Sequence, residues 1–150
     1  MIRLISSFFY IGYLPIASGT YASIAGVLLF FFLRGNSFYL GAVTGLIVVL
    51  GFMTCGRAEK IFKVKDSSKI VIDEVSGMLI CCCFIPHTHT FFYTLLVFSL
   101  FRVFDILKPF PINKIQDLKG SLGVMWDDIL AAFYALALIY LIDYIRIILT

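Results

Sequence analysis

The stretch LGVMWDDILAAFYALALIYLI, residues 122–142, decides the fold class, because it is apolar over almost its whole length. A helix of this length reaches roughly 30 Å, which matches the hydrocarbon core of a bilayer. Its two charges, Asp127 and Asp128, lie near its start. An ionisable group beside hydrocarbon is costly and is usually functional. The stretch therefore predicts a membrane-spanning helix that carries part of a functional site.

The composition of the whole chain agrees with a membrane protein. Hydrophobic residues make up 61% of the 150 residues and charged residues 14%, and the mean hydropathy is +1.02. Ordinary soluble domains are roughly 45–50% apolar and about 25% charged. The length fits one domain, residues 1–150. The net charge of +3 is too small to indicate nucleic-acid binding. The four cysteines lie in apolar runs and are expected to be small buried hydrophobes.

Apolar runs of 16 to 21 residues recur along the chain. We expect an all-α, polytopic bundle of about five spans, over residues 16–33, 38–55, 70–85, 91–107 and 122–142. A 17-residue helix reaches roughly 26 Å, so the shorter spans are expected to tilt or to thin the bilayer. Polar segments at 34–37, 56–69, 86–90 and 108–121 connect the spans. The apolar run 4–16 is re-entrant, interfacial or packed in the bundle, and the sequence leaves these alternatives open.

Lysine and arginine are distributed asymmetrically between the two sides of the membrane. With the N-terminus in the cytoplasm, Arg3, the 56–69 loop and the 102–119 region hold ten of the twelve basic residues on the inside. Only Arg34 and Arg146 then fall outside. Cytoplasmic loops carry an excess of basic residues, so this orientation is favoured.

The same orientation brings five of the nine carboxylates to one membrane boundary: Asp73, Glu74, Asp105, Asp127 and Asp128. Carboxylate oxygens suit Mg²⁺, which binds together with substrate phosphates. Arginine offers a planar fork to phosphate oxygens and lysine a point charge, and Arg102, Lys108 and Lys60 supply these. The pattern indicates metal-assisted phosphoryl chemistry on a phospholipid. Motifs of other phosphate chemistries, namely Cys-x5-Arg, Asp-x-Asp and the P-loop, do not occur.

Helix geometry refines this site. Arg102 and Asp105 are three residues apart and share a helix face. Adjacent acidic residues diverge by about 100°, so we expect one member of each pair to bind the metal and the other to support it. Which member does so stays open. Thr20 is a plausible N-cap that presents N–H groups to a phosphate, although an ordinary helix start is favoured.

The remaining polar residues are expected to be unremarkable. Three acidic residues in basic loops read as solvated charges, and one near the far end reads as interfacial; these are Glu59, Asp66, Asp117 and Asp143. Two histidines, His87 and His89, are favoured as loop residues over metal ligands.

Four segments together resemble the phosphatidylglycerophosphatase A family. They are IDEVSGM at 72–78, FRVFDILKPFPI at 101–112, GSLGVMWDD at 120–128 and SGTYAS at 18–23. The resemblance implies an all-helical, Mg²⁺-dependent bacterial membrane enzyme. It would convert phosphatidylglycerophosphate into phosphatidylglycerol and inorganic phosphate. Matching positions are Gly19, Thr20, Ser23, Lys60, Asp66, Asp73, Glu74, Arg102, Asp105, Lys108, Asp127 and Asp128. The match at Asp66 weakens its reading as a solvated charge. Ser18 and Ala132 depart from the family's usual proline and glycine.

The resulting hypothesis is hydrolysis of a lipid phosphomonoester at the cytoplasmic surface of a bacterial inner membrane. Asp73, Glu74, Asp127 and Asp128 would hold Mg²⁺, and Asp105 would be a further ligand or the base. Arg102 and Lys108 would grip the phosphate, with Thr20 and Lys60 beside them. A metal-dependent lipid phosphotransferase and a non-enzymatic ion or proton carrier are the alternatives. The partner is the lipid substrate in the bilayer, and homo-oligomer formation stays open.

Overall fold

The computed structural model describes residues 1–86 and 90–149. Over these residues all regular secondary structure is helical, which confirms the expected fold class. The elements are α1 (Ile2–Ser6), the 3-10 helix η1 (Ile11–Tyr13), α2 (Ser18–Leu33), α3 (Ser37–Phe62), α4 (Ile72–Phe84), α5 (Thr90–Leu107), α6 (Ile112–Ile115) and α7 (Ser121–Leu149). His87 and His89, together with part of the expected 86–90 turn, lie outside the described residues.

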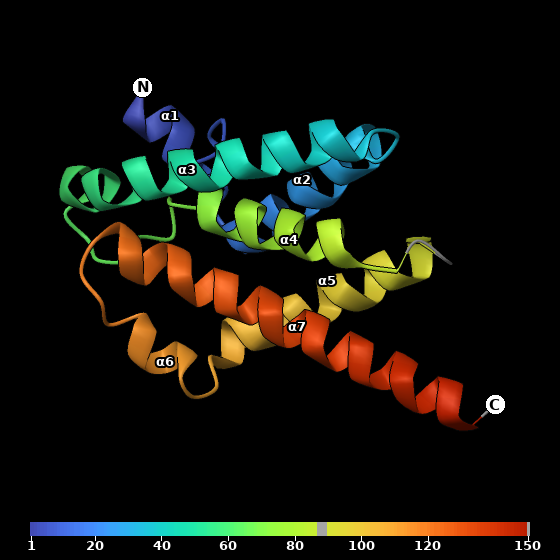
Figure 1. The fold of residues 1–150 in the computed structure, drawn as a ribbon. Coiled ribbons are helices and arrows are strands. Elements are labelled where there is room, and N and C mark those ends of the chain that lie inside the picture. The colour runs from blue at the N-terminus through green and yellow to red at the C-terminus, as the bar shows by residue number, and fades with distance from the viewer. Residues whose placement is uncertain (87–89, 150) are drawn as a thin grey trace.

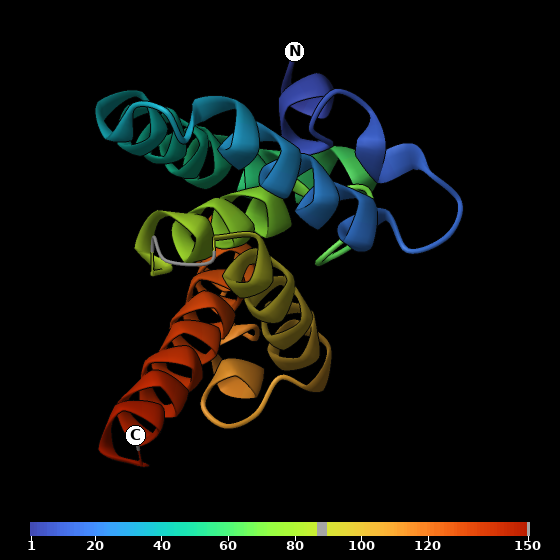
Figure 2. The same ribbon diagram turned by 90° about the vertical axis from the view of Figure 1, so that its right-hand side faces the viewer.

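Helix α4 is the centre of the bundle. It lies between a layer formed by α2 and α3 and a second layer formed by α5 and α7 (Figures 1 and 2). Nine of its 13 residues are buried, including Val75, Met78 and Leu79. Glycines allow this close packing, because a Cβ at Gly77 would lie 2.8 Å from the ring of Phe101. Small residues at helix contacts are typical of membrane bundles.

The number of spans differs from the expected five. Three described helices, α3, α5 and α7, are long and apolar enough to cross a membrane. Helix α2 is apolar but has only 16 residues, and α4 has 13 and reaches about 20 Å. The apolar run 70–85 is thus surrounded by protein instead of lipid, which explains why it can be so short.

The connections fit the expected pattern in part. The turn after α2 is as expected, and Asn36 caps α3 by accepting hydrogen bonds from the N–H groups of Phe38 and Tyr39 at 3.0 and 3.3 Å. The expected loop 56–69 is partly wrong, because α3 continues to Phe62. Charged residues with good helix propensity extend that helix beyond its apolar part.

The run 4–16 does not form a long helix. It contributes to α1 and η1, and α1 packs against α3. The N–H of Val71 donates to the carbonyl of Ser6 at 2.9 Å, which ties the segment to the start of α4. Phe9 and Ile16 remain largely exposed. The segment is therefore packed on the bundle with part of its apolar surface uncovered.

One end of the bundle collects the termini that carry the polar motifs. The starts of α2, α4 and α7 and the ends of α3 and α5 all lie at this end, toward the left of Figure 1. We call it the basic end, since Arg3, the α3–α4 connection and the α5–α7 connection belong to it. The fold thus gathers the acidic and basic motifs at one level.

Candidate active site

Three carboxylates from two helices form a buried cluster at the basic end. Asp73 and Glu74 lie in the first turn of α4, and Asp128 lies in the second turn of α7. One oxygen of each lies within 4.8 Å of the others. Asp73 and Asp128 are 5% and 3% exposed. Buried charges are very costly unless paired or bound to a metal.

Two oxygens of this cluster have no hydrogen-bond partner in the part of the chain that the structure describes. They are Oε2 of Glu74 and Oδ1 of Asp128. Asp73 is better satisfied, because its Oδ1 accepts the N–H of Glu74 at 3.1 Å. The cluster therefore offers unpaired, hard oxygen atoms that a divalent cation can use.

Asp127 has a different environment from its neighbour Asp128. Nζ of Lys108 donates to Oδ2 of Asp127 at 2.6 Å, and Lys108 lies 3.8 Å from Oδ2 of Asp66. Burial alone would lower the pKa of Lys108, but the hydrogen bond and charge of Asp127 and the charge of Asp66 raise it above its ordinary value. Lys108 follows α5 with a positive φ of 42°, and its N–H bonds to the carbonyl of Phe104 at 2.9 Å. The end of α5 thus fixes a charged lysine beside the acidic cluster.

Asp66 is part of a hydrogen-bonded network. Its Oδ2 accepts from Nε2 of Gln116 at 2.8 Å, and its own N–H donates to Oε1 of Glu59 at 2.8 Å. Asp66 and Glu59 are half-buried, so reading them as freely solvated charges is wrong. Asp117 fits that reading, since it is exposed and pairs only loosely with Lys65 at 3.4 Å. Gln116 was not expected, because an isolated glutamine in a loop carries no spacing signal.

Arg102 and Asp105 form an ion pair on one face of α5. Nη1 of Arg102 donates to Oδ2 of Asp105 at 2.6 Å, and both side chains are less than one fifth exposed. Nε of Arg102 is buried and has no partner among the described residues. A Cβ on Gly19, at the start of α2, would overlap Oε1 of Glu74 and lie 3.2 Å from Nη1 of Arg102. Gly19 therefore marks the point where α2, α4 and α5 meet.

Other predicted residues lie near this point or at the same end. Thr20 is not the N-cap of α2; the cap is Ala17, whose φ is 52°, and Thr20 is half-buried inside the first turn. Ser23 is buried and donates to the carbonyl of Gly19 at 2.9 Å. Lys60 is exposed in the last turn of α3, and the described residues give it no ion-pair partner. It thus shares the basic end without joining the cluster.

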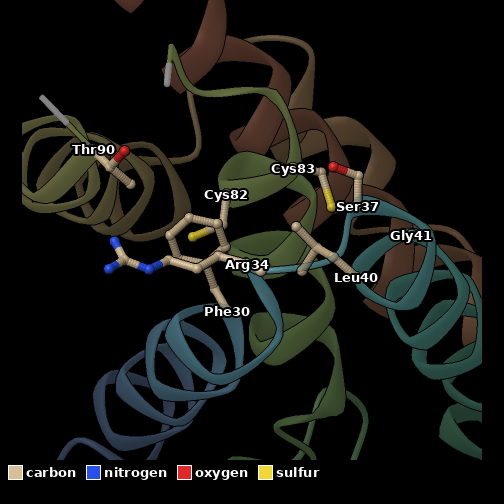
Figure 3. A pocket seen from close by; sticks show the side chains of 9 residues that line it. Phe30, Arg34, Ser37, Leu40, Gly41, Cys82, Cys83 and Thr90 are labelled. Carbon is tan, nitrogen blue, oxygen red and sulfur yellow. The ribbon is translucent and has the colours of Figure 1, made fainter. Parts of the chain in front are cut away.

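A separate cavity lies at the opposite end of the bundle. It has a volume of about 540 Å³, and its lining includes Phe30 of α2, Arg34 just after α2 and Cys82 of α4 (Figure 3). None of its lining residues is acidic. The cysteines behave as expected, because Cys55, Cys81 and Cys82 are free and buried and Cys83 is half-buried. This cavity has an arginine but no carboxylate to hold a metal ion, and the basic end remains the candidate site.

Comparison with known proteins identifies the family of this chain. The chain is 37% identical over 147 residues to phosphatidylglycerophosphatase A of Haemophilus influenzae, which covers 95% of this chain and 89% of that protein. Identity to phosphatidylglycerophosphatase A of Escherichia coli is 29% over 135 residues, covering 89% and 78%. A protein of Bacteroides thetaiotaomicron, provisionally named a phosphatidylinositol-3-phosphatase, is 36% identical over 143 residues, covering 91% and 89%. No solved structure matches.

The family model described as Phosphatidylglycerophosphatase A matches residues 4–143, a range that includes every residue of the site. The chain is therefore a phosphatase that belongs to the phosphatidylglycerophosphatase A family.

Proposed function

We propose that the protein hydrolyses the terminal phosphate of phosphatidylglycerophosphate, which yields phosphatidylglycerol and inorganic phosphate. One observation carries the proposal: acidic residues and two basic side chains converge at one end of an apolar bundle. Family membership supports the substrate. We further propose that this end faces the cytoplasm from a bacterial inner membrane, in line with the excess of basic residues there.

We propose that the reaction uses Mg²⁺, held by Asp73, Glu74 and Asp128. The fit rests on three clustered carboxylates, two of which have buried oxygens without a partner among the described residues. When bound, the ion would polarise a phosphoryl oxygen and lower the pKa of a water molecule. Asp127 was expected among the ligands, but its hydrogen bond to Lys108 favours a positioning role.

The basic side chains would bind the phosphate. Nε of Arg102 has no partner in the described part of the chain, so part of the planar fork is available to phosphate oxygens while Nη1 stays on Asp105. Lys108 is held by Asp127 and supplies a compact positive charge. Asp105 lies outside the three-carboxylate cluster and is the proposed base that accepts a proton from the attacking water.

Metal removal tests this proposal. Purified protein in detergent micelles should release phosphate from phosphatidylglycerophosphate, lose that activity in EDTA and regain it with excess Mg²⁺. Phosphatidylinositol 3-phosphate is the comparison substrate, in view of the Bacteroides relative's name. Phosphate release that persists in EDTA would contradict the metal role. Transfer of the phosphate to an added alcohol without inorganic phosphate would instead indicate a phosphotransferase.

Substitution of Gly19 by alanine tests the meeting point of α2, α4 and α5. The new Cβ would overlap Oε1 of Glu74 and press on Arg102. We expect kcat/KM to fall about tenfold or more, since small displacements of positioned groups have large effects on rate. Gly45→Ala in α3 is the matched control, because nothing lies within 4 Å of its Cβ position. Equal activity of the two variants would show that this contact does not position the site.

A further inference from the structure

A shallow apolar groove lies between α2 and α5. It has a volume of about 170 Å³ and is lined by Ile24 and Val27 of α2 and by Thr94, Leu95 and Phe98 of α5. The one polar member, Thr94, donates its hydroxyl to the carbonyl of Thr90 at 2.7 Å, so its polar group is satisfied within the helix. The groove is therefore suited to hydrocarbon.

The groove leads to the candidate active site. On α5, Phe98 lies one turn before Arg102, and residues four apart share a helix face. On α2, Ile24 lies one turn after Thr20. The two helices run in opposite directions and come together at their site-forming ends, where Gly19 lies against Arg102. An apolar strip thus continues directly into the phosphate-binding end.

This continuity distinguishes the groove from other apolar hollows on the protein. A hollow of about 300 Å³ between α4 and α7, lined by residues that include Phe133 and Ala137, holds no residue of the basic end. Another, of about 400 Å³, reaches the basic end, because it is lined by N-terminal residues that include Phe8 and by residues of α2, α3 and α4 that include Ile72, next to Asp73. Only the α2–α5 groove among these three joins helix faces that carry Thr20 and Arg102.

We propose that the α2–α5 groove holds a segment of one acyl chain of the lipid substrate while the phosphate lies at Arg102. This inference rests on the proposed lipid phosphatase function. A chain leaving the bilayer for this groove exchanges one apolar contact for another, so little net hydrophobic gain is expected. The groove acts by position instead: it aligns the long axis of the lipid with the site and limits the poses of the headgroup.

Plugging the groove tests the proposal. Val27→Trp fills the groove from α2. Ile24→Trp also fills it from α2, and because Ile24 is 42% exposed, this second variant keeps the test valid if Val27→Trp does not fold. Ala137→Trp, in the α4–α7 hollow, is the matched control. The probes are dioleoyl phosphatidylglycerophosphate and its deacylated, water-soluble headgroup. We expect kcat/KM for the dioleoyl lipid to fall about tenfold in the two groove variants. For the deacylated headgroup it should stay within about twofold.

Three outcomes would overturn the proposal. An equal loss of kcat/KM on both substrates would indicate that the substitutions disturb the structure. No loss of kcat/KM on either substrate would indicate that the groove contacts bulk lipid only. If light scattering in detergent finds the unsubstituted protein as a dimer and Val27→Trp as a monomer, the groove is assigned to a second copy of the chain. Failure of the proposed function can be distinguished from failure of the groove proposal, because the unsubstituted protein would then release no phosphate from phosphatidylglycerophosphate. If another diacyl phosphomonoester is the substrate, the same comparison of variants is made with that lipid.

Discussion

Replacing Asp128 with asparagine is expected to lower phosphate release on the order of 10³-fold, the scale of losing a well-placed electrostatic group in an active site. Asparagine keeps the size of the side chain but removes the charge at a position that is 3% exposed and has an unpaired Oδ1. The bundle should remain folded, because the substitution removes a buried charge without leaving a void. Turnover of phosphatidylglycerophosphate and Mg²⁺-induced change in thermal unfolding measure the two effects.

The control for this variant is Asp117→Asn at the same end of the bundle. Asp117 is 83% exposed in its side chain and pairs weakly with Lys65, so its loss should leave turnover unchanged. If Asp128→Asn retained turnover within a few fold, or if its unfolding still responded to Mg²⁺ as before, the three-carboxylate cluster would not be the metal site.

Replacing Arg102 with lysine is expected to lower kcat/KM about 100-fold, although the charge is kept. Lysine has one ammonium group and cannot bond Asp105 while offering a second, fixed donor to a phosphate oxygen. In the structure Nη1 of Arg102 is engaged by Asp105 at 2.6 Å, and Nε is the buried donor without a partner. The substitution should lower kcat/KM for phosphatidylglycerophosphate. It should leave the binding of phosphatidylglycerol, which lacks the terminal phosphate, unchanged.

Arg57→Lys is the control for charge-conserving replacement. Arg57 is exposed on α3 near the basic end, so lysine should serve equally well there. Near-equal kcat/KM for Arg102→Lys and the unsubstituted protein would show that charge alone is needed at position 102 and that the planar fork is not used.

The limits of sequence interpretation are clearest at α4. Its apolar run predicted a span, since hydropathy reports that a segment avoids water and does not report what surrounds it. The tertiary packing of Val75, Gly77 and Met78 between two helix layers decided otherwise. The start of α7 was predictable, because the long apolar run that follows Asp127 and Asp128 is typical of a membrane-spanning helix. The end of α3 was not, because charged residues continue a helix as readily as they begin a loop.

The candidate site shows the same division. Its convergence at one end followed from alternating spans and from the distribution of lysine and arginine, and the structure places Asp73, Glu74 and Asp128 together as that pattern suggests. Individual partners did not follow. The hydrogen bond between Lys108 and Asp127 depends on the direction in which the chain leaves α5. The hydrogen bonds of Asp66 join Glu59, near the end of α3, to Gln116, which is 50 residues further along the chain than Asp66.

The short length of α4 bears on how the protein is made. A 13-residue helix with two acidic residues in its first turn gains too little from lipid to enter a bilayer by itself. Its insertion is then expected to depend on the neighbouring helices: α3 is long and apolar enough to enter the bilayer first, and α4 is covered as α5 and α7 follow. We therefore expect cooperative biogenesis, in which α7 completes the acidic cluster by bringing Asp128 to Asp73 and Glu74.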